Sequence, residues 1–449
     1  MKNIGWFCSI HDHPWQEQKV KLSNKSGRLF VETTGETDQT MEGFGACFNE
    51  LAWIALNNAK EEEKRTLLEN LFGAQGLDFS FCRMPVGAND YAKDWYSFDE
   101  TPNDYDMEHF SIERDRTYLM PFLKEAKKYK KEFKMFASPW SPPTWMKERP
   151  VYNTGAAIRM EPDILRAYAL YFEKFVRAYE SEGIQIHQIH VQNEPFANQN
   201  FPSCLWKPEQ LRIFIGDYLG PHFEKAGLDT EIWLGTLNGP FEASMEERDL
   251  AVALPDSNYE RYVSSILYDE KAMNYIKGVG YQWAGKAAID KTHQDFPDLK
   301  LMQTESECGM GENDWRHAEY VFSLMNHYFR YGASAYIYWN MALKPGGLST
   351  WAWPQNSLTT VNADGSITYN PEYYVMKHFS NAVKPGALYL KTKGPWASAS
   401  SVFLNPDQTI AVIAGNAQHE EQEFTFSHKG EYFHTRLSPH SFHTFLFQA

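Results

Sequence analysis

Short apolar runs and longer amphipathic stretches alternate along the chain from about residue 40. Each apolar run predicts a buried strand and each amphipathic stretch a helix, so the alternation indicates a parallel sheet covered by helices. Eight repeats of this unit predict a closed (β/α)8 barrel, with an open doubly wound sheet as the alternative. The expected strands span residues 41–48, 79–86, 134–140, 186–194, 231–237, 275–283, 299–305 and 334–340.

The clearest helix is expected between Glu161 and Gly183. Apolar side chains recur there at i, i+4 and i+7 positions from Ile164 to Tyr179, which is the period of one buried helix face. The glycine predicts where the helix ends.

Beyond about residue 383 the pattern changes to short alternating runs of apolar and polar residues, separated by turn signals such as Asn405-Pro406-Asp407. Alternation with a period of two predicts strands, and no helical period is present. A similar run at 28–34 is expected to pair with this tail. The prediction is therefore an α/β fold in two parts: a (β/α)8 TIM barrel over 38–382, and an antiparallel β-sandwich side domain from 1–37 plus 383–449.

The composition is that of a folded globular protein. Of 449 residues, 43% are hydrophobic and 22% charged, and a chain of this length buries a large core unaided. The 43 Lys and Arg against 58 Asp and Glu give a net charge of −15. Because binding of nucleic acid needs clustered basic residues, and no such cluster is present, no nucleic-acid partner is expected. Aromatic residues make up 15%, enough either to fill a core or to line a sugar-binding groove.

The five cysteines are odd in number and widely spaced. They fit neither a disulfide framework nor a C-x-x-C metal or redox site. The N-terminal residues show no signal-peptide pattern, and no apolar run approaches the length of about 18 residues that would suggest a membrane span. The predicted localisation is cytoplasmic, although a leader removed beforehand would leave the same sequence.

Chemically active residues are expected where the predicted strands end, because a barrel carries its catalytic side chains at the C-terminal ends of its strands. Glu194 ends the fourth strand and Glu305 the seventh. Cleavage of a glycosidic bond needs one carboxyl group to protonate the leaving oxygen and another to handle the oxocarbenium-like centre. A closed barrel brings both glutamates to one mouth, which indicates a carbohydrate-cleaving site. Other residues at or just beyond strand ends are Arg83, Asp90, Trp140, Asn193, Trp339 and Asn340.

Six segments form an ordered set between about residues 39 and 390: QTMEGFGACFNE, FCRMPVGANDYA, ASPWSPPTWMK, NEP, the Thr-Glu pair at 304–305, and YWNMAL. This set resembles glycoside hydrolase family 30, the glucosylceramidase-like group of a large clan of barrel glycosidases. The NEP triplet alone would be weak evidence, but the ordered set is specific. The β-rich tail also fits the side domain of that family.

By this resemblance, Glu194 matches the family's acid/base and Glu305 its nucleophile, in a retaining double-displacement mechanism. Asn193 matches the residue that hydrogen-bonds the sugar 2-hydroxyl. A nearby Glu305 carboxylate is expected to raise the pKa of Glu194 by like-charge repulsion and so keep the acid protonated. The positions that match residues shaping the −1 subsite, which holds the cleaved sugar, are Arg83, Asp90, Trp140 and Trp339.

The sixth strand departs from the family pattern. Family members often carry a His-Trp-Tyr run there, whose tyrosine hydrogen-bonds the nucleophile, whereas this chain has Gln282, Trp283 and Ala284. Another residue must therefore orient Glu305, or its reactivity is tuned differently. Gln282 and Trp283 are taken as substrate contacts.

Several other residues have competing interpretations. Glu307 lies two residues past Glu305, and a continued strand would point both side chains to the same face. The match to the family favours Glu305. Trp206, Trp351 and Trp353 follow the fourth and eighth strands, and they either line outer sugar subsites or fill the core.

The histidines do not indicate a metal site. His11 and His13 are expected in a solvated turn, and His187 and His190 packed within a strand. No metal-binding or nucleotide-binding motif is present, so no metal and no cofactor are expected.

The sequence thus predicts a retaining β-glycosidase, of exo or short-chain action, that hydrolyses β-glucosides and is glucosylceramidase-like. Its expected partner is a carbohydrate or small glycoside, and its oligomeric state stays open. β-Xylosidase, β-fucosidase and β-1,6-glucanase are alternatives on the same scaffold. A non-catalytic carbohydrate-binding barrel is disfavoured because both glutamates are present. A metal-dependent hydrolase is a third class, which insensitivity to EDTA would exclude.

Overall fold

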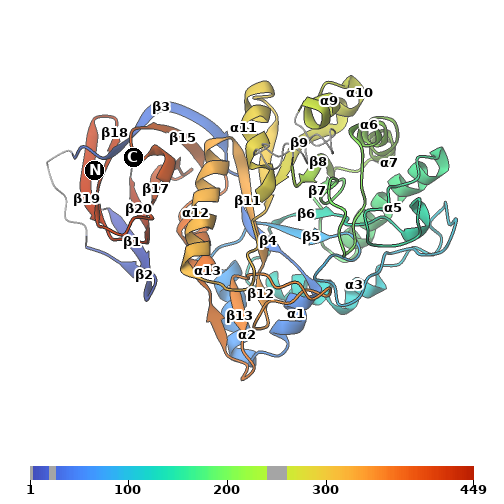
Figure 1. Ribbon diagram of the computed structural model, residues 1–449, viewed down its shortest axis with the longest axis horizontal. Coiled ribbons are helices and arrows are strands. Elements are labelled where there is room, and N and C mark those ends of the chain that lie inside the picture. Colours follow the sequence, from blue (N-terminus) through green and yellow to red (C-terminus); the bar gives the residue numbers. More distant parts are fainter. Residues whose placement is uncertain (1–3, 20–26, 240–259, 449) are drawn as a thin grey trace.

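The computed structural model describes residues 4–19, 27–239 and 260–448 (Figure 1). A barrel surrounded by helices forms one part of the molecule and a large β-sheet the other. The strands nearest the two ends of the chain, β1 (Gly5–Ile10) and β20 (Ser441–Gln448), pair with each other in that sheet.

Eight parallel strands close the barrel, as the alternation of apolar and amphipathic segments predicts. The last strand pairs with the first, with Ala335 beside Gly43, so the open-sheet alternative is wrong. The barrel strands are β4 (Gly43–Cys47), β5 (Phe81–Pro85), β6 (Lys134–Ser138), β7 (Gln188–His190), β8 (Glu231–Leu237), β9 (Ile276–Gln282), β10 (Lys300–Glu305) and β11 (Ala333–Asn340).

Strand β7 is shorter than the predicted strand 186–194. After His190 the chain leaves regular strand geometry, although the backbone N–H of Gln192 still donates to Gly235 and that of Glu194 to Thr236, both at 2.9 Å. Glu194 has a φ of +48°, a left-handed conformation that ends a strand. The turn carries the Glu194 side chain away from the period-two pattern of the strand.

The helix predicted over 161–183 is α5 (Pro162–Ser181), and Gly183 follows it with a φ of +75°. Its buried face carries the apolar residues that the period marks, from Ile164 to Tyr179. The remaining helices are α1 (Glu50–Leu56), α2 (Glu61–Phe72), α3 (Glu113–Thr117), α4 (Leu119–Ala126), α6 (Pro208–Ile213), α7 (Gly220–Ala226), α9 (Ser265–Leu267), α10 (Glu270–Tyr275), α11 (Lys286–Asp295), α12 (Trp315–Arg330) and α13 (Pro371–Ser380).

The second part is a nine-stranded sheet in the order β19-β18-β3-β15-β16-β17-β20-β1-β2. The run at 28–34 pairs with the tail as expected, because β3 lies between β15 and β18. Its pairing with β18 is parallel, so the sheet is not purely antiparallel. Strands β1, β2 and β19 lie outside the predicted runs. The strands not yet given are β2 (His13–Glu17), β3 (Phe30–Thr40), β15 (Leu388–Lys393), β16 (Ser400–Leu404), β17 (Thr409–Asn416), β18 (Gln422–His428) and β19 (Glu431–Leu437).

Helix α12 joins the two parts (Figure 1). The Phe442 ring of β20 lies 5.0 Å from the rings of both Trp315 and Phe322 on this helix. Phe424, Phe433 and Phe445 belong to a second apolar cluster, within the sheet part itself. A three-stranded sheet, β12 (Ala342–Leu343), β13 (Thr359–Val361) and β14 (Ile367–Tyr369), follows the last barrel strand.

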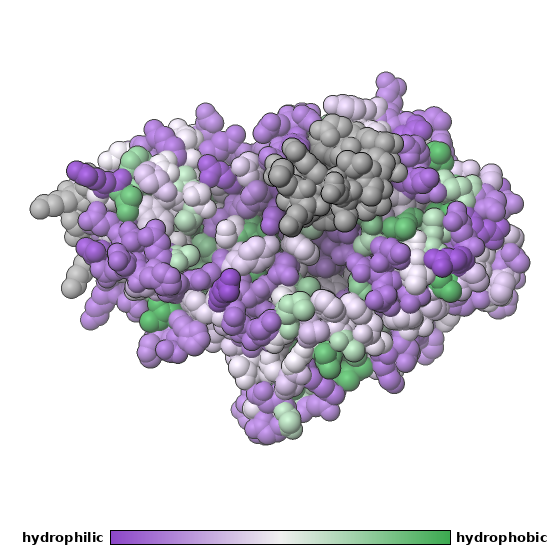
Figure 2. Space-filling model, in the orientation of Figure 1, coloured by the Kyte–Doolittle hydropathy of each residue, from purple (hydrophilic) through white to green (hydrophobic). Residues whose placement is uncertain are grey.

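The face shown in Figure 2 is mostly hydrophilic, with apolar residues in small separate patches. Among the described residues, none of the helices combines the length and apolar character that crossing a bilayer requires. All five cysteines are unpaired, and four of them are buried.

Candidate active site

Arg83 lies at the centre of the candidate site. It comes from β5, is 0% exposed, and its guanidinium donates to Oε2 of Glu305 at 2.5 Å. It also donates to Oδ1 of Asn193 at 2.6 Å and to the Ser138 hydroxyl at 2.9 Å. A buried arginine needs such partners, because an unpaired buried charge costs several kcal/mol. The barrel thus joins the ends of β5, β6 and β10 and the start of the loop after β7 through one cation.

Gln282 and Thr236 complete the hydrogen-bond network. The Gln282 amide nitrogen lies 3.0 Å from Oε2 of Glu305 and 2.8 Å from Oδ1 of Asn193. The Thr236 hydroxyl donates to the same Asn193 oxygen at 2.8 Å. In this chain, which lacks the family's strand-six tyrosine, Gln282 therefore hydrogen-bonds the Glu305 carboxylate.

Glu194 begins the loop after β7, and the Gln199 amide donates to its Oε2 at 3.3 Å. Burial raises the pKa of Glu194 to about 8, and the charges of Glu305 and Asp90 add to this rise. The direction agrees with the prediction from sequence, but burial has a larger effect than like-charge repulsion. A carboxyl group of this kind stays protonated at neutral pH, as a general acid requires.

Burial also raises the pKa of Glu305, but the charge and hydrogen bond of Arg83 oppose that rise. Within residues 4–19, 27–239 and 260–448, no cation forms an ion pair with Glu194, which faces the charge of Glu305. Arg83 thus favours the ionised form of Glu305, whereas the surroundings of Glu194 favour its protonated form. Asp90, in the loop after β5, is buried, and burial raises its pKa to about 8.

Trp140 and Trp339 pack beside the Arg83 guanidinium. Their rings stack at 5.6 Å, and the guanidinium lies 4.5 Å from the ring of Trp140 and 5.4 Å from that of Trp339. Both rings are buried, so they stabilise the position of the Arg83 side chain by cation–π contacts. Trp283 is half-buried and packs against the main core.

The three tryptophans expected either in outer subsites or in the core, Trp206, Trp351 and Trp353, differ in exposure. Trp206 is only 3% exposed and its indole N–H donates to Gln192, so the burial favours the second of its two interpretations, a core residue. Trp351 and Trp353 follow β11 and stack on each other at 5.2 Å with 9° between their planes. Trp353 is 41% exposed. This pair is accessible to a ligand and Trp206 is not.

Glu307 turns away from the other two glutamates. Its Oε1 accepts from the backbone N–H of Gly309 at 3.1 Å, and its Oε2 lies 3.5 Å from Nδ1 of His317 on α12. Glu305 contacts Arg83 and Gln282 instead. The geometry thus favours Glu305 for chemistry in the barrel.

Sequence reasoning missed Ser138, Thr236 and Gln199. Ser138 and Thr236 lie at or near the ends of β6 and β8, and both hydrogen-bond Arg83 or Asn193. Inspection of every strand end would have found these two. Gln199 lies in an irregular loop, and nothing in its sequence context marks it.

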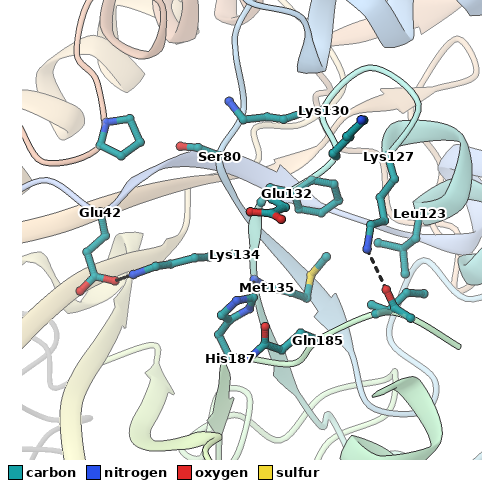
Figure 3. A pocket seen from close by; sticks show the side chains of 15 residues that line it. Glu42, Ser80, Leu123, Lys127, Lys130, Glu132, Lys134, Met135, Gln185 and His187 are labelled. Atoms are coloured by element: carbon teal, nitrogen blue, oxygen red, sulfur yellow. Dashed lines mark hydrogen bonds and ion pairs between the residues drawn. The ribbon is translucent and has the colours of Figure 1, made fainter. Parts of the chain in front are cut away.

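The opposite end of the barrel holds a cavity of about 550 Å³ (Figure 3). It is lined by residues where strands begin, and three of its lysines have partners: Lys134 pairs with Glu42 at 2.9 Å, Lys127 donates to the Gly183 carbonyl, and Lys130 pairs with Asp78. These pairs neutralise or satisfy the cations. The cavity is therefore not a candidate for the predicted chemistry, which belongs to the strand ends.

The expectations for the histidines hold in part. His11 and Asp12 form an exposed turn between β1 and β2, whereas His13 begins β2. His190 in β7 packs between Phe136 and Trp233 at 4.5 and 5.2 Å, whereas His187 precedes β7 and is half-buried. Within the described part of the chain, no three His, Cys, Asp or Glu side chains gather as a metal site would require.

The closed barrel and the paired glutamates around a buried arginine define a barrel enzyme built for glycosidic chemistry. The family model for the "Glycosyl hydrolase family 30 TIM-barrel domain" matches residues 41–383, and that for the "Glycosyl hydrolase family 30 beta sandwich domain" matches residues 398–445. The chain belongs to glycosyl hydrolase family 30, and it is a glycoside hydrolase.

Curated relatives span nearly the whole chain. A protein named putative glucosylceramidase 3 from Caenorhabditis elegans is 28% identical over 96% of this chain and 84% of its own length. The lysosomal acid glucosylceramidase of Mus musculus is 26% identical over 91% of this chain and 81% of its own. A solved endo-β1,6-glucanase is 25% identical, with a TM-score of 0.85 and 99% of both chains covered.

Proposed function

We propose that the protein is a retaining β-glucosidase in which Glu194 is the acid/base and Glu305 the nucleophile. One observation carries this proposal: the buried Glu305 and the half-buried Glu194 interact electrostatically, and of the two only Glu305 bonds the Arg83 cation. One group is thereby kept protonated and the other ionised, which are the states that the first step of double displacement requires.

In the first step Glu194 gives its proton to the glycosidic oxygen while Glu305 attacks the anomeric carbon. The bond to the leaving group breaks, and a glycosyl ester on Glu305 forms. The ester carries no charge, so the pKa of Glu194 falls and its carboxylate can take a proton from water. That water attacks the anomeric carbon, releases Glu305, and leaves the sugar with its original configuration.

The proposed sugar in the −1 subsite is glucose. The relatives are named glucosylceramidases and an endo-β1,6-glucanase, and these names share a glucosyl unit. The second candidate is therefore a β-1,6-glucanase on the same site, a substrate class that the solved glucanase supports.

A panel of aryl β-glucoside, xyloside, fucoside and galactoside tests the sugar. We expect the glucoside to have the highest kcat/KM, and a preference for xyloside or fucoside would refute the assignment. A β-1,6-linked glucose disaccharide and trisaccharide, compared with glucosylceramide, separate the two candidates. A glucanase cleaves the β-1,6 trisaccharide with higher kcat/KM than the aryl glucoside.

The pH dependence of the reaction follows from the same two groups. Glu194 must be protonated, so kcat/KM falls as pH rises through its pKa of about 8. Glu305 must be ionised, so kcat/KM falls again as pH drops through the pKa of that group. The expected profile of an aryl β-glucoside is a bell with its basic limb near pH 8.

The variants Glu194→Gln and Asp90→Asn locate the basic limb, because burial raises both carboxyl pKa values to about 8. With an aryl glucoside whose leaving group needs a proton, the limb persists in Asp90→Asn, and the residual activity of Glu194→Gln no longer shows it. The reverse result would assign the limb to Asp90.

The stacked pair Trp351 and Trp353 supports an outer sugar subsite. Trp351 lies 5.4 Å from the ring of Phe201, which shares a cluster with Trp140 and Trp339. A flat exposed indole is suited to a sugar face. We expect Trp353→Ala to raise KM for a β-linked glucose disaccharide by about threefold to tenfold, since a stacking contact contributes about 0.5–1.5 kcal/mol.

The KM of methyl β-glucoside, which has no second sugar, should change less than twofold in Trp353→Ala. Tyr268→Ala, at an aromatic side chain that is 70% exposed near α10, is the matched control and should leave both values unchanged. Equal effects on both substrates would remove the outer subsite.

A further inference from the structure

We propose that Gln282 is the positioning residue of the nucleophile, where one amide group holds both Glu305 and Asn193 in place of the tyrosine that this chain lacks. The inference rests on the proposed function, because it takes Glu305 as the attacking group. It also revises the expectation that Gln282 is a substrate contact.

The position of Gln282 follows from the barrel register. It is the last residue of β9 and lies directly beside Glu305 in the β9–β10 pairing. Its amide nitrogen has two hydrogens and two close acceptors, Oε2 of Glu305 at 3.0 Å and Oδ1 of Asn193 at 2.8 Å. The bond to the carboxylate is charge-assisted, which makes it one of the stronger kinds of hydrogen bond.

The two Glu305 oxygens have different surroundings. Oε2 accepts from Gln282 at 3.0 Å and from Arg83 at 2.5 Å. Oε1 receives no hydrogen bond from the residues that the structure describes. One oxygen is therefore held by two donors, one from the neighbouring β9 and one from β5 across the barrel, while the other is left to attack the anomeric carbon.

The same amide sets the orientation of Asn193. Oδ1 of Asn193 accepts hydrogen bonds from Gln282, Arg83 and Thr236, at 2.8, 2.6 and 2.8 Å. Because three donors surround this oxygen, the Asn193 amide is oriented with Oδ1 toward the network, and its NH2 group takes no part in those three bonds. That group is then a donor for a hydroxyl on the sugar carbon next to the anomeric centre. Through these two hydrogen bonds, Gln282 links the orientation of Glu305 to the recognition of the sugar 2-hydroxyl by Asn193.

The backbone of Gln282 is itself fixed by neighbouring residues. The residue is fully buried, and the Tyr328 hydroxyl of α12 donates to its backbone carbonyl. A 3₁₀ turn over Trp283–Gly285 begins directly after it. These contacts fix the backbone from which the Gln282 side chain extends, which a positioning residue needs.

Removal of the amide has a predictable electrostatic sign. A hydrogen bond to the ionised carboxylate favours the charged form, so its loss raises the pKa of Glu305. Among the described residues, the other charged or titratable groups that interact with Glu305 are on five side chains, and the substitution leaves all of them in place. They are Cys47 from β4, Arg83 from β5, Asp90 after β5, Glu194 after β7 and Cys308 after β10. The acid limb of the kcat/KM profile is expected to move to higher pH.

Gln282→Met tests the proposal, because it keeps the shape of the side chain and removes the donor. We expect kcat/KM for an aryl β-glucoside to fall about 10- to 100-fold, in line with the loss of a hydrogen bond to a charged group. The acid limb should move to higher pH, and discrimination against the 2-deoxy analogue should shrink by about threefold or more. An unchanged acid limb together with unchanged discrimination would overturn the proposal.

The matched control is Gln188→Met, which removes a buried glutamine amide that bonds Glu231 on neighbouring β8. It should lower the melting temperature without moving the acid limb or the 2-deoxy ratio. A merely structural role of Gln282 would give this same result.

Restoring the family's run provides an independent comparison. Gln282→His should be impaired, and Gln282→His/Ala284→Tyr should recover at least tenfold in kcat/KM, because the tyrosine supplies a new donor to Glu305. A double variant with the melting temperature of the single variant and no recovery would count against the proposal. Rescue of Glu305→Ala by azide tests the nucleophile itself, so failure of the proposed function is distinguishable from failure of this inference.

Discussion

Glu305→Ala is expected to lower kcat for an aryl β-glucoside by about 10⁴-fold or more, since removal of a nucleophile leaves only binding and the other catalytic groups. Added azide should restore turnover, because the small anion fits the space left by the carboxylate and attacks the anomeric carbon directly. One displacement inverts the configuration, so the product should be the α-glucosyl azide. Mass spectrometry and NMR of the product measure this outcome.

The control for this experiment is Glu307→Ala. Glu307 is bonded to Gly309 and lies near His317, away from Arg83. This variant should retain activity within about tenfold and show no azide product. If Glu307→Ala were instead the variant that azide rescues, the assignment of the nucleophile would be wrong.

Glu194→Gln is expected to affect substrates according to their leaving groups. General acid catalysis contributes roughly 10²–10⁴-fold, so a glucoside with a poorly acidic aglycone should lose about that factor. A dinitrophenyl glucoside, whose leaving group departs without a proton, should form the glycosyl ester at nearly the normal rate and then accumulate it. Azide should attack this ester from the face opposite to Glu305 and give the β-glucosyl azide. This product is the opposite anomer to the one expected from Glu305→Ala.

Glu372→Gln separates a raised pKa from a catalytic role. Glu372 on α13 is fully buried, and burial raises its pKa to about 8, as it does for Glu194. Its carboxyl group bonds Asn356 and takes no part in the Arg83 network. The Glu372→Gln variant should keep the wild-type dependence of the rate on the leaving group. For Glu194→Gln, an α-glucosyl azide product would refute the acid/base assignment.

Local pattern was enough for much of the fold. The eight barrel strands and α5 follow from hydrophobic periodicity, because a buried strand and a one-sided helix impose different repeats on the chain. Strands β1, β2 and β19 were missed, since their runs are short and half-exposed and carry a weak apolar signal. The end of β7 was misplaced because the chain leaves regular strand geometry after His190, although its backbone still bonds β8 at Gln192 and Glu194, and residue type does not mark that change.

The sequence by itself determined the barrel, the two glutamates at strand ends and the resemblance to family 30, because each depends on residue type and order along the chain. The tertiary structure decided what depends on distances across the barrel. It placed Gln282 against Glu305, turned Glu307 away, buried Trp206 and made burial the main cause of the raised pKa of Glu194. Those outcomes arise from contacts between strands far apart in sequence, and a one-dimensional pattern carries no measure of such contacts.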